Sequence, residues 1–158
     1  MRKLKVGIFS FTCDEGCSIN FLEILNSKFK EWGGFLDFKH FRLIQSKSNL
    51  KNLDIAFIEG AISTKKEKEK AKKIRRIAKK VVAIGNCAIE GFISAQRNSF
   101  DEGRKREIEP ILKKFGHMDK VLSVKDVIEV DDEVPGCPML ETKFIEIMER
   151  YLKEFGVK

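Results

Sequence analysis

The chain has 158 residues, 42% of them hydrophobic, which is the size of one domain that can bury a substantial core. It contains no run of the roughly 18 to 20 apolar residues that a membrane-spanning helix needs, and no small-residue cleavage site follows its first apolar stretch. We therefore expect a single domain over residues 1–158 in the cytoplasm. Four cysteines in such a chain favour reduced thiols, metal ligands or redox groups over a disulfide framework.

The formal net charge of +7 is concentrated in one segment. Residues 65–80, KKEKEKAKKIRRIAKK, have a local charge of +8, which leaves −1 for the remainder of the chain. Thr64 and Glu67 fit a capping box, and the apolar residues recur at helical spacing, so we predict an amphipathic surface helix over residues 64–80. Because the basicity is confined to this helix, we expect no nucleic-acid binding; the helix has either a solvated face or a docking face for an acidic protein.

Short apolar runs alternate with helical patterns along the chain, which is typical of an α/β fold with a parallel sheet. The runs are sufficient for a flavodoxin-like, doubly wound, largely parallel sheet of five strands. We predict these strands at residues 4–9, 35–43, 55–58, 81–84 and 127–130.

Two segments have the apolar periodicity of helices that pack on a core. In residues 18–32 the predicted core stripe is Ile19, Leu22, Leu25, Phe29 and Trp32. In the C-terminal segment it is Leu140, Phe144, Ile147, Met148, Tyr151, Leu152 and Phe155. Residues 91–122 are polar and predict a loop that leads into a short helix, with Pro110 in its first turn.

The cysteines follow predicted strands. Cys13 and Cys17 come after the first strand, Cys87 after the fourth and Cys137 after the fifth. Loops at the carboxyl ends of parallel strands border the crevice in which ligands bind. All four thiols therefore reach one edge of the sheet and can converge on one site.

Four thiolates are the ligands that a 4Fe–4S cluster or a structural zinc ion requires. Glycines beside the cysteines allow the backbone to approach closely and amide groups to point at sulfur. Compact zinc sites usually show two local cysteine pairs, whereas this chain has one pair and two single cysteines, so the spacing favours a cluster. The alternatives are inert thiols buried as small apolar residues, and redox chemistry in which Cys13 and Cys17 form a disulfide.

The order of the motifs resembles that of a known family. FTCDEGC is followed by DIAFIEGAIS, VVAIGNCAIEG and VIEVDDEVPGCP. From residue 5 to residue 155 this series is similar to the nickel–iron hydrogenase small subunits and to the homologous cluster-bearing small subunit of NADH:quinone oxidoreductase (complex I). The resemblance implies a domain that holds one 4Fe–4S cluster and relays electrons to or from a large catalytic subunit, which covers the cluster.

The resemblance also implies a ligand set. Cys17, Cys87 and Cys137 match the family's second, third and fourth ligand positions. The hydrogenase members usually carry CxxC in the first loop, whereas this chain carries CxxxC. Either Cys13 or Asp14 is then the remaining ligand, and a carboxylate in that position would change the stability and potential of the cluster.

Glu59, in the IEG motif, matches an acidic residue that the family places near the cluster. We expect it to assist proton movement coupled to electron flow; the alternative is a solvated or helix-capping glutamate. Hydrogenase small subunits typically continue into a region with further clusters, whereas four cysteines here allow one cluster at most. Nickel–iron chemistry belongs to the family's large subunit, so we expect this chain to be a non-catalytic subunit of an oxidoreductase.

Two other functions stay open. A flavodoxin-like flavin protein needs a loop after the first strand that binds phosphate, and SFTCDEGCS supplies Ser10, Thr12 and Ser18 but places two acidic residues among them. A cofactor-free docking or assembly subunit would keep the fold only as a surface for a partner.

Overall fold

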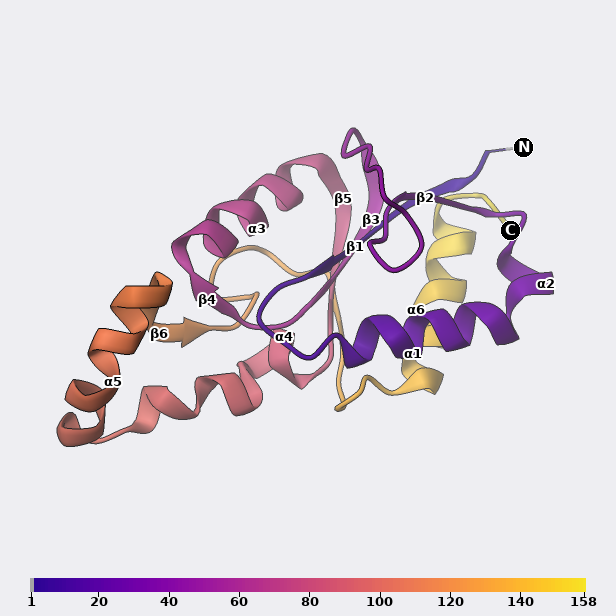
Figure 1. The fold of residues 1–158 in the computed structure, drawn as a ribbon. Coiled ribbons are helices and arrows are strands. Elements are labelled where there is room, and N and C mark those ends of the chain that lie inside the picture. Colours follow the sequence, from indigo (N-terminus) through magenta and orange to yellow (C-terminus); the bar gives the residue numbers. More distant parts are fainter. Residues whose placement is uncertain (1) are drawn as a thin grey trace.

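The computed structural model describes residues 2–158, which form a five-stranded sheet and a separate two-stranded one (Figure 1). The strands of the larger sheet are all parallel and lie in the order β2-β1-β3-β5-β7. They are β1 (Leu4–Ser10), β2 (Leu36–His40), β3 (Leu53–Glu59), β5 (Ala78–Ile84) and β7 (Asp132–Val134). Counted within this sheet, the order is the flavodoxin-like 2-1-3-4-5, so the predicted fold class is confirmed.

Helices cover both faces of the sheet, and the central strand β3 is buried along its whole length (Figure 1). On one face, α1 (Gly16–Ser27), α2 (Phe29–Trp32) and α6 (Glu141–Glu154) bury a core rich in phenylalanine. On the other face, α3 (Lys65–Ile77) packs through Ala71 and Ile74. Both faces are therefore closed, as a parallel sheet requires.

The first helical segment buries a different face from the predicted one. Phe21 and Ile24 lie in the core, whereas Ile19, Leu22 and Phe29 are 51%, 38% and 71% exposed. The segment is also divided into α1 and α2. The predicted face was wrong because the segment carries two apolar sets at helical spacing, and periodicity alone does not say which set meets the sheet.

The predicted fifth strand was also wrong. Residues 127–130 form a turn and a loop, and the fifth strand of the sheet is β7 (Asp132–Val134). Just before it, the Asp131 carboxylate accepts the Val81 N–H at 2.8 Å. The apolar Ile128 reaches the core from the loop instead. A short edge strand in which only one residue is buried leaves little apolar signal in the sequence.

Residues 92–122 form an arm that extends away from the larger sheet (Figure 1). The arm consists of the 3-10 helix η1 (Phe92–Ser99), α5 (Glu102–Phe115) and β6 (His117–Leu122). Strand β6 pairs antiparallel with β4 (Ile62–Thr64), and neither strand was predicted. Since η1 and α5 contain no buried residue, the arm is attached mainly through this two-stranded sheet.

Pro110 lies inside α5 rather than in its first turn, as the sequence had indicated. The helix begins earlier because the Asp101 side chain caps it, accepting the Arg104 N–H at 2.9 Å. Pro110 has no N–H to donate, so the helix continues through it with one backbone hydrogen bond fewer. The predicted short helix is therefore a helix of 14 residues.

The basic segment begins at the predicted capping box. Thr64 Oγ1 accepts the Glu67 N–H at 3.1 Å, and the Glu67 carboxylate accepts the Thr64 N–H at 2.9 Å. Helix α3 ends at Ile77, short of the predicted residue 80, because Ala78 begins β5 and pairs with Leu53 of β3. Sheet pairing thus overrides the helical pattern of the last basic residues.

The C-terminal stripe was predicted well. Its central members are buried in α6: Phe144, Ile147, Met148, Tyr151 and Leu152. Leu140 was expected in the core but is 53% exposed, since it precedes the helix as its N-cap. No helix within residues 2–158 is both long enough and apolar enough to cross a membrane.

The structure predicts opposite effects for two phenylalanines of the first helical segment. Phe21→Ala should lower the free energy of unfolding by about 3–5 kcal/mol, because the ring is fully buried and lies 4.8 Å from the ring centroid of Phe144. Phe29→Ala, the matched control, should change it by about 0.5 kcal/mol or less. Urea denaturation followed by circular dichroism measures both, and a larger loss for Phe29→Ala would contradict the observed face.

Candidate functional site

All four cysteines line one cavity at the carboxyl edge of the larger sheet. The cavity has a volume of about 200 Å³, and its walls come from the segments that follow β1, β3, β5 and β7. The residues that the sequence identified as candidate ligands or acidic neighbours are all in its lining: Cys13, Asp14, Cys17, Glu59, Cys87 and Cys137. The convergence follows from parallel pairing, which brings the carboxyl ends of the strands to one edge.

Backbone hydrogen bonds join these segments in pairs. Thr12 and Ala61 exchange N–H···O bonds of 3.0 and 2.9 Å, which tie the segment after β1 to the one after β3. Asn86 donates its N–H to the Gly136 carbonyl at 2.9 Å, and its Oδ1 accepts the Gly136 N–H at 2.7 Å. The loops that carry Cys87 and Cys137 are therefore fixed to each other.

Two of the cysteines lie in the first turns of helices. Cys17 is the second residue of α1, and Cys87 is the second residue of α4 (Asn86–Glu90). Gly85 has a φ of +81°, and a Cβ built there would lie 2.5 Å from the Cys17 Sγ. Glycine is thus required both by its backbone conformation and by the close approach of β5 to this sulfur.

The environment of the thiols opposes their ionisation. Burial raises the pKa of Cys13 to about 12 and that of Cys17 to about 11, and it also raises the pKa of Cys87. For Cys13 the hydrogen bond from the Glu15 N–H opposes this effect, while the negative charge of Glu59 adds to it. The thiols therefore stay protonated at neutral pH unless a cationic group enters among them.

The thiols line the walls of the cavity rather than surround one point. Within residues 2–158, no three His, Cys, Asp or Glu side chains are arranged to hold one metal ion. Tetrahedral zinc would bring its sulfur ligands to about 3.8 Å from one another, because each Zn–S bond is about 2.3 Å. A 4Fe–4S cluster is larger and takes each thiolate at a different iron, so the four-thiol set fits such a cluster better than it fits a single ion.

Glu59 ends β3 and is 1% exposed. One of its oxygens accepts hydrogen bonds from the hydroxyls of Ser10, at 2.6 Å, and of Ser18. The other accepts the Ser18 N–H at 3.0 Å. Ser18 lies in the first turn of α1, where N–H groups have no partner within the helix, so Glu59 caps α1 from a neighbouring strand. The helix-capping alternative is thus observed, and the solvated one is wrong.

Sequence reasoning missed the supporting roles of Ser10, Ser18 and Asn86. The two serines had been considered only as donors to a phosphate, and Asn86 had no role. A signal for Asn86 was present, because asparagine between a glycine and the next element commonly bonds to nearby backbone. Nothing local indicated that both serines meet Glu59, which is 49 and 41 residues away.

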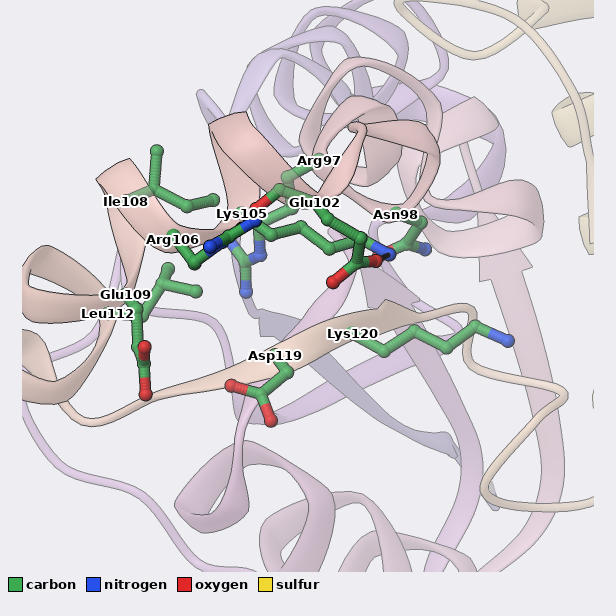
Figure 2. Close-up of a pocket in the computed structure, with 10 residues that line it drawn as sticks. All are labelled: Arg97, Asn98, Glu102, Lys105, Arg106, Ile108, Glu109, Leu112, Asp119 and Lys120. Atoms are coloured by element: carbon green, nitrogen blue, oxygen red, sulfur yellow. Dashed lines mark hydrogen bonds and ion pairs between the residues drawn. The ribbon is translucent and has the colours of Figure 1, made fainter.

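A second hollow, of about 410 Å³, lies on the arm between α5 and β6 (Figure 2). Figure 2 shows cationic and acidic side chains together in its lining, and Lys105 pairs with Glu102 at 2.9 Å. None of the cysteines lines this hollow. Its charges partly offset one another, so the cavity at the sheet edge remains the candidate site.

Comparisons with known proteins agree with this arrangement. The family model described as NADH ubiquinone oxidoreductase, 20 Kd subunit, matches residues 13–151. The chain is 26% identical to sulfhydrogenase 2 subunit delta of Pyrococcus furiosus over 148 residues, which are 92% of this chain and 60% of the relative. It is 28% identical to one of the subunits of the F420-non-reducing hydrogenase of Methanothermobacter marburgensis over 168 residues, which cover 96% of this chain and 54% of the relative. The chain thus spans little more than half the length of these relatives.

Two solved structures share the fold. A chain of an NAD+-reducing [NiFe]-hydrogenase in the H2-reduced state superposes with a TM-score of 0.80 at 23% identity, over 96% of this chain and 93% of that chain. A chain of the Dm. baculatum [NiFeSe]-hydrogenase does so with a TM-score of 0.63 at 17% identity, over 99% and 66%. The family match over most of the residues, together with these relatives, shows that the chain belongs to the NADH ubiquinone oxidoreductase 20 Kd subunit family, which includes hydrogenase subunits.

Proposed function

We propose that this chain is an electron-transfer subunit of a multisubunit oxidoreductase, hydrogenase-like or complex I-like, and that its cavity holds one 4Fe–4S cluster. The observation that carries the proposal is the convergence of four thiols, far apart in the sequence, on one cavity. Cys17, Cys87 and Cys137 would each bind one iron, and the first loop supplies the fourth ligand. When bound, the cluster supplies one-electron redox chemistry.

The chain's own residues prepare the cavity for such a group. Burial of Cys13 and Cys17 keeps bulk water from the sulfur ligands, and the fixed loops limit how far the thiols move apart. Glu59 holds a carboxylate beside the cavity through its bonds to Ser10 and Ser18. Because hydroxyl groups both donate and accept hydrogen bonds, this group is the proposed route for proton movement coupled to electron flow.

Exposed apolar side chains near the cavity support a large protein partner. Each lies a few residues beyond a cysteine: Ile19 after Cys17, Phe92 and Ile93 after Cys87, and Leu140 after Cys137. Their exposed fractions are 51%, 39%, 64% and 53%. Large apolar side chains gathered on a surface mark protein interfaces, so we propose that the catalytic subunit covers this edge. A docking role for α3 stays a separate prediction.

The loop after β1 does not favour the flavin alternative. A bound phosphate would need the hydroxyls of Ser10, Thr12 and Ser18. In the structure all three interact with carboxylates, those of Glu59 and Glu67. The hydroxyls are therefore already engaged, and the two acidic groups would repel a phosphate.

The first prediction is that reconstitution under anaerobic, reducing conditions gives about four irons and four sulfides per chain, with a brown absorbance. Cys87→Ser should abolish that absorbance, because it removes one of the single-cysteine ligands, whereas Glu90→Gln, an exposed change in the same helix, should retain it. Iron and acid-labile sulfide analysis with visible spectra measures both.

Other outcomes would identify the alternatives. Near-zero iron in the wild-type protein would contradict the proposal. A colourless protein with four freely titrating thiols would favour a cofactor-free docking subunit. A yellow fluorescent chromophore released on denaturation would favour a flavin protein.

The second prediction concerns the charge of Glu59. Glu59→Gln should raise the midpoint potential of the reconstituted centre, because a nearby negative charge disfavours the gain of an electron. An interaction of about 1.4 kcal/mol corresponds to about 59 mV for one electron. Redox titration followed by EPR measures the shift, with Glu90→Gln as the control; an unchanged or lower potential for Glu59→Gln would count against its place beside the centre.

A further inference from the structure

The first loop offers two donors for the fourth ligand, and the following inference rests on the proposed function. Cys13 and Asp14 both line the cavity. The spacing CxxxC contains one residue more than the usual CxxC of hydrogenase members. The loop must therefore either accommodate the additional residue while using Cys13, or use the carboxylate at the next position.

We infer that Cys13 is the fourth ligand and that Asp14 is a positioning residue that shapes the loop. The inference rests on three observations: where each side chain lies, what the Asp14 carboxylate already binds, and how the backbone absorbs the additional residue.

The Asp14 carboxylate is engaged with its own loop. Its Oδ1 accepts the Gly16 N–H at 3.0 Å, and the side chain is exposed. A side-chain oxygen that bonds to the N–H two residues on forms an Asx-turn, and here that turn leads directly into α1 at Gly16. A Cβ at Gly16 would lie 3.1 Å from this oxygen, so the carboxylate lies close against the backbone.

The next residue absorbs the additional length. Glu15 has φ 63° and ψ 15°, a left-handed conformation that is uncommon outside glycine, and it forms the N-cap of α1. This conformation turns the Glu15 N–H toward the Cys13 Sγ, at 3.4 Å. The chain reverses over these residues, so Cys13 and Cys17 line the same cavity although three residues separate them.

The environment of Cys13 is that of a cluster ligand. Its side chain is half-buried, and the hydrogen bond from the Glu15 N–H is the type of N–H···S bond that stabilises a thiolate bound to iron. Thiolate is also the softer donor and the one that iron–sulfur clusters use, whereas a carboxylate is a hard ligand. The cluster would then have four thiolate ligands.

The test compares two substitutions in the full-length chain, reconstituted anaerobically with iron, sulfide and a reductant. Asp14→Asn keeps an oxygen for the Gly16 N–H but removes the anionic donor, so it should retain about four irons per chain and the wild-type EPR spectrum. Cys13→Ala should reduce the content to about three irons. The oxidised variant should then give a new EPR signal, because three ferric ions leave an unpaired spin.

The positioning role of Asp14 has its own readout. Asp14→Ala removes the turn and should lower the yield of reconstituted cluster, whereas Asp14→Asn should restore it. If Cys13→Ala does not fold by circular dichroism, Cys13→Ser replaces it. Its harder oxygen ligand should change the EPR line shape of the reduced centre.

The outcomes separate this inference from the proposed function. Four irons and an unchanged spectrum in the Cys13 variants would overturn the ligand assignment, and so would a loss of iron in Asp14→Asn. A yield unaffected by Asp14→Ala would overturn the positioning role alone. A wild-type chain that holds no iron would instead overturn the proposed function.

Discussion

The site depends on the hydrogen bonds between loops at the carboxyl edge of the sheet. Parallel strands bring their ends to this edge, but the loops beyond them are held only where their backbones pair. Thr12 with Ala61 and Asn86 with Gly136 supply that pairing. Without them the thiols would lie on separate segments, so a cavity of about 200 Å³ is a property of the loop contacts as much as of the sheet.

The electrostatics of the cavity follow from this placement. Burial and neighbouring negative groups raise the thiol pKa values, so the arrangement is unfavourable for free thiolates and favourable for a cationic centre. Glu59 adds a buried carboxylate whose hydrogen bonds come from Ser10 and Ser18. The same group thus caps α1 and sets the charge beside the cavity, which links the stability of the first helix to the chemistry proposed for the site.

The surface carries a comparable double demand. Helix α1 buries Phe21 and Ile24 against the sheet and exposes Ile19 and Leu22 on its outer side. A chain that functions alone has little reason to keep a second apolar face, whereas a subunit covered by a partner does. The error in the predicted face of this helix therefore has a physical source: the sequence carries one apolar pattern for the core and another for a contact outside the chain.

The sequence by itself determined the alternation of strands and helices, the capping box of α3, the buried stripe of α6 and the position of the cysteines after strands, because these depend on local spacing. It did not locate β7, whose polar residues form an edge strand only by pairing with β5, nor β4 and β6. Tertiary structure alone decided which face of α1 is buried, that Glu59 meets Ser10 and Ser18, and how Asp14 and Glu15 shape the first loop. Each depends on contacts between distant segments, or on a backbone conformation that residue types do not specify.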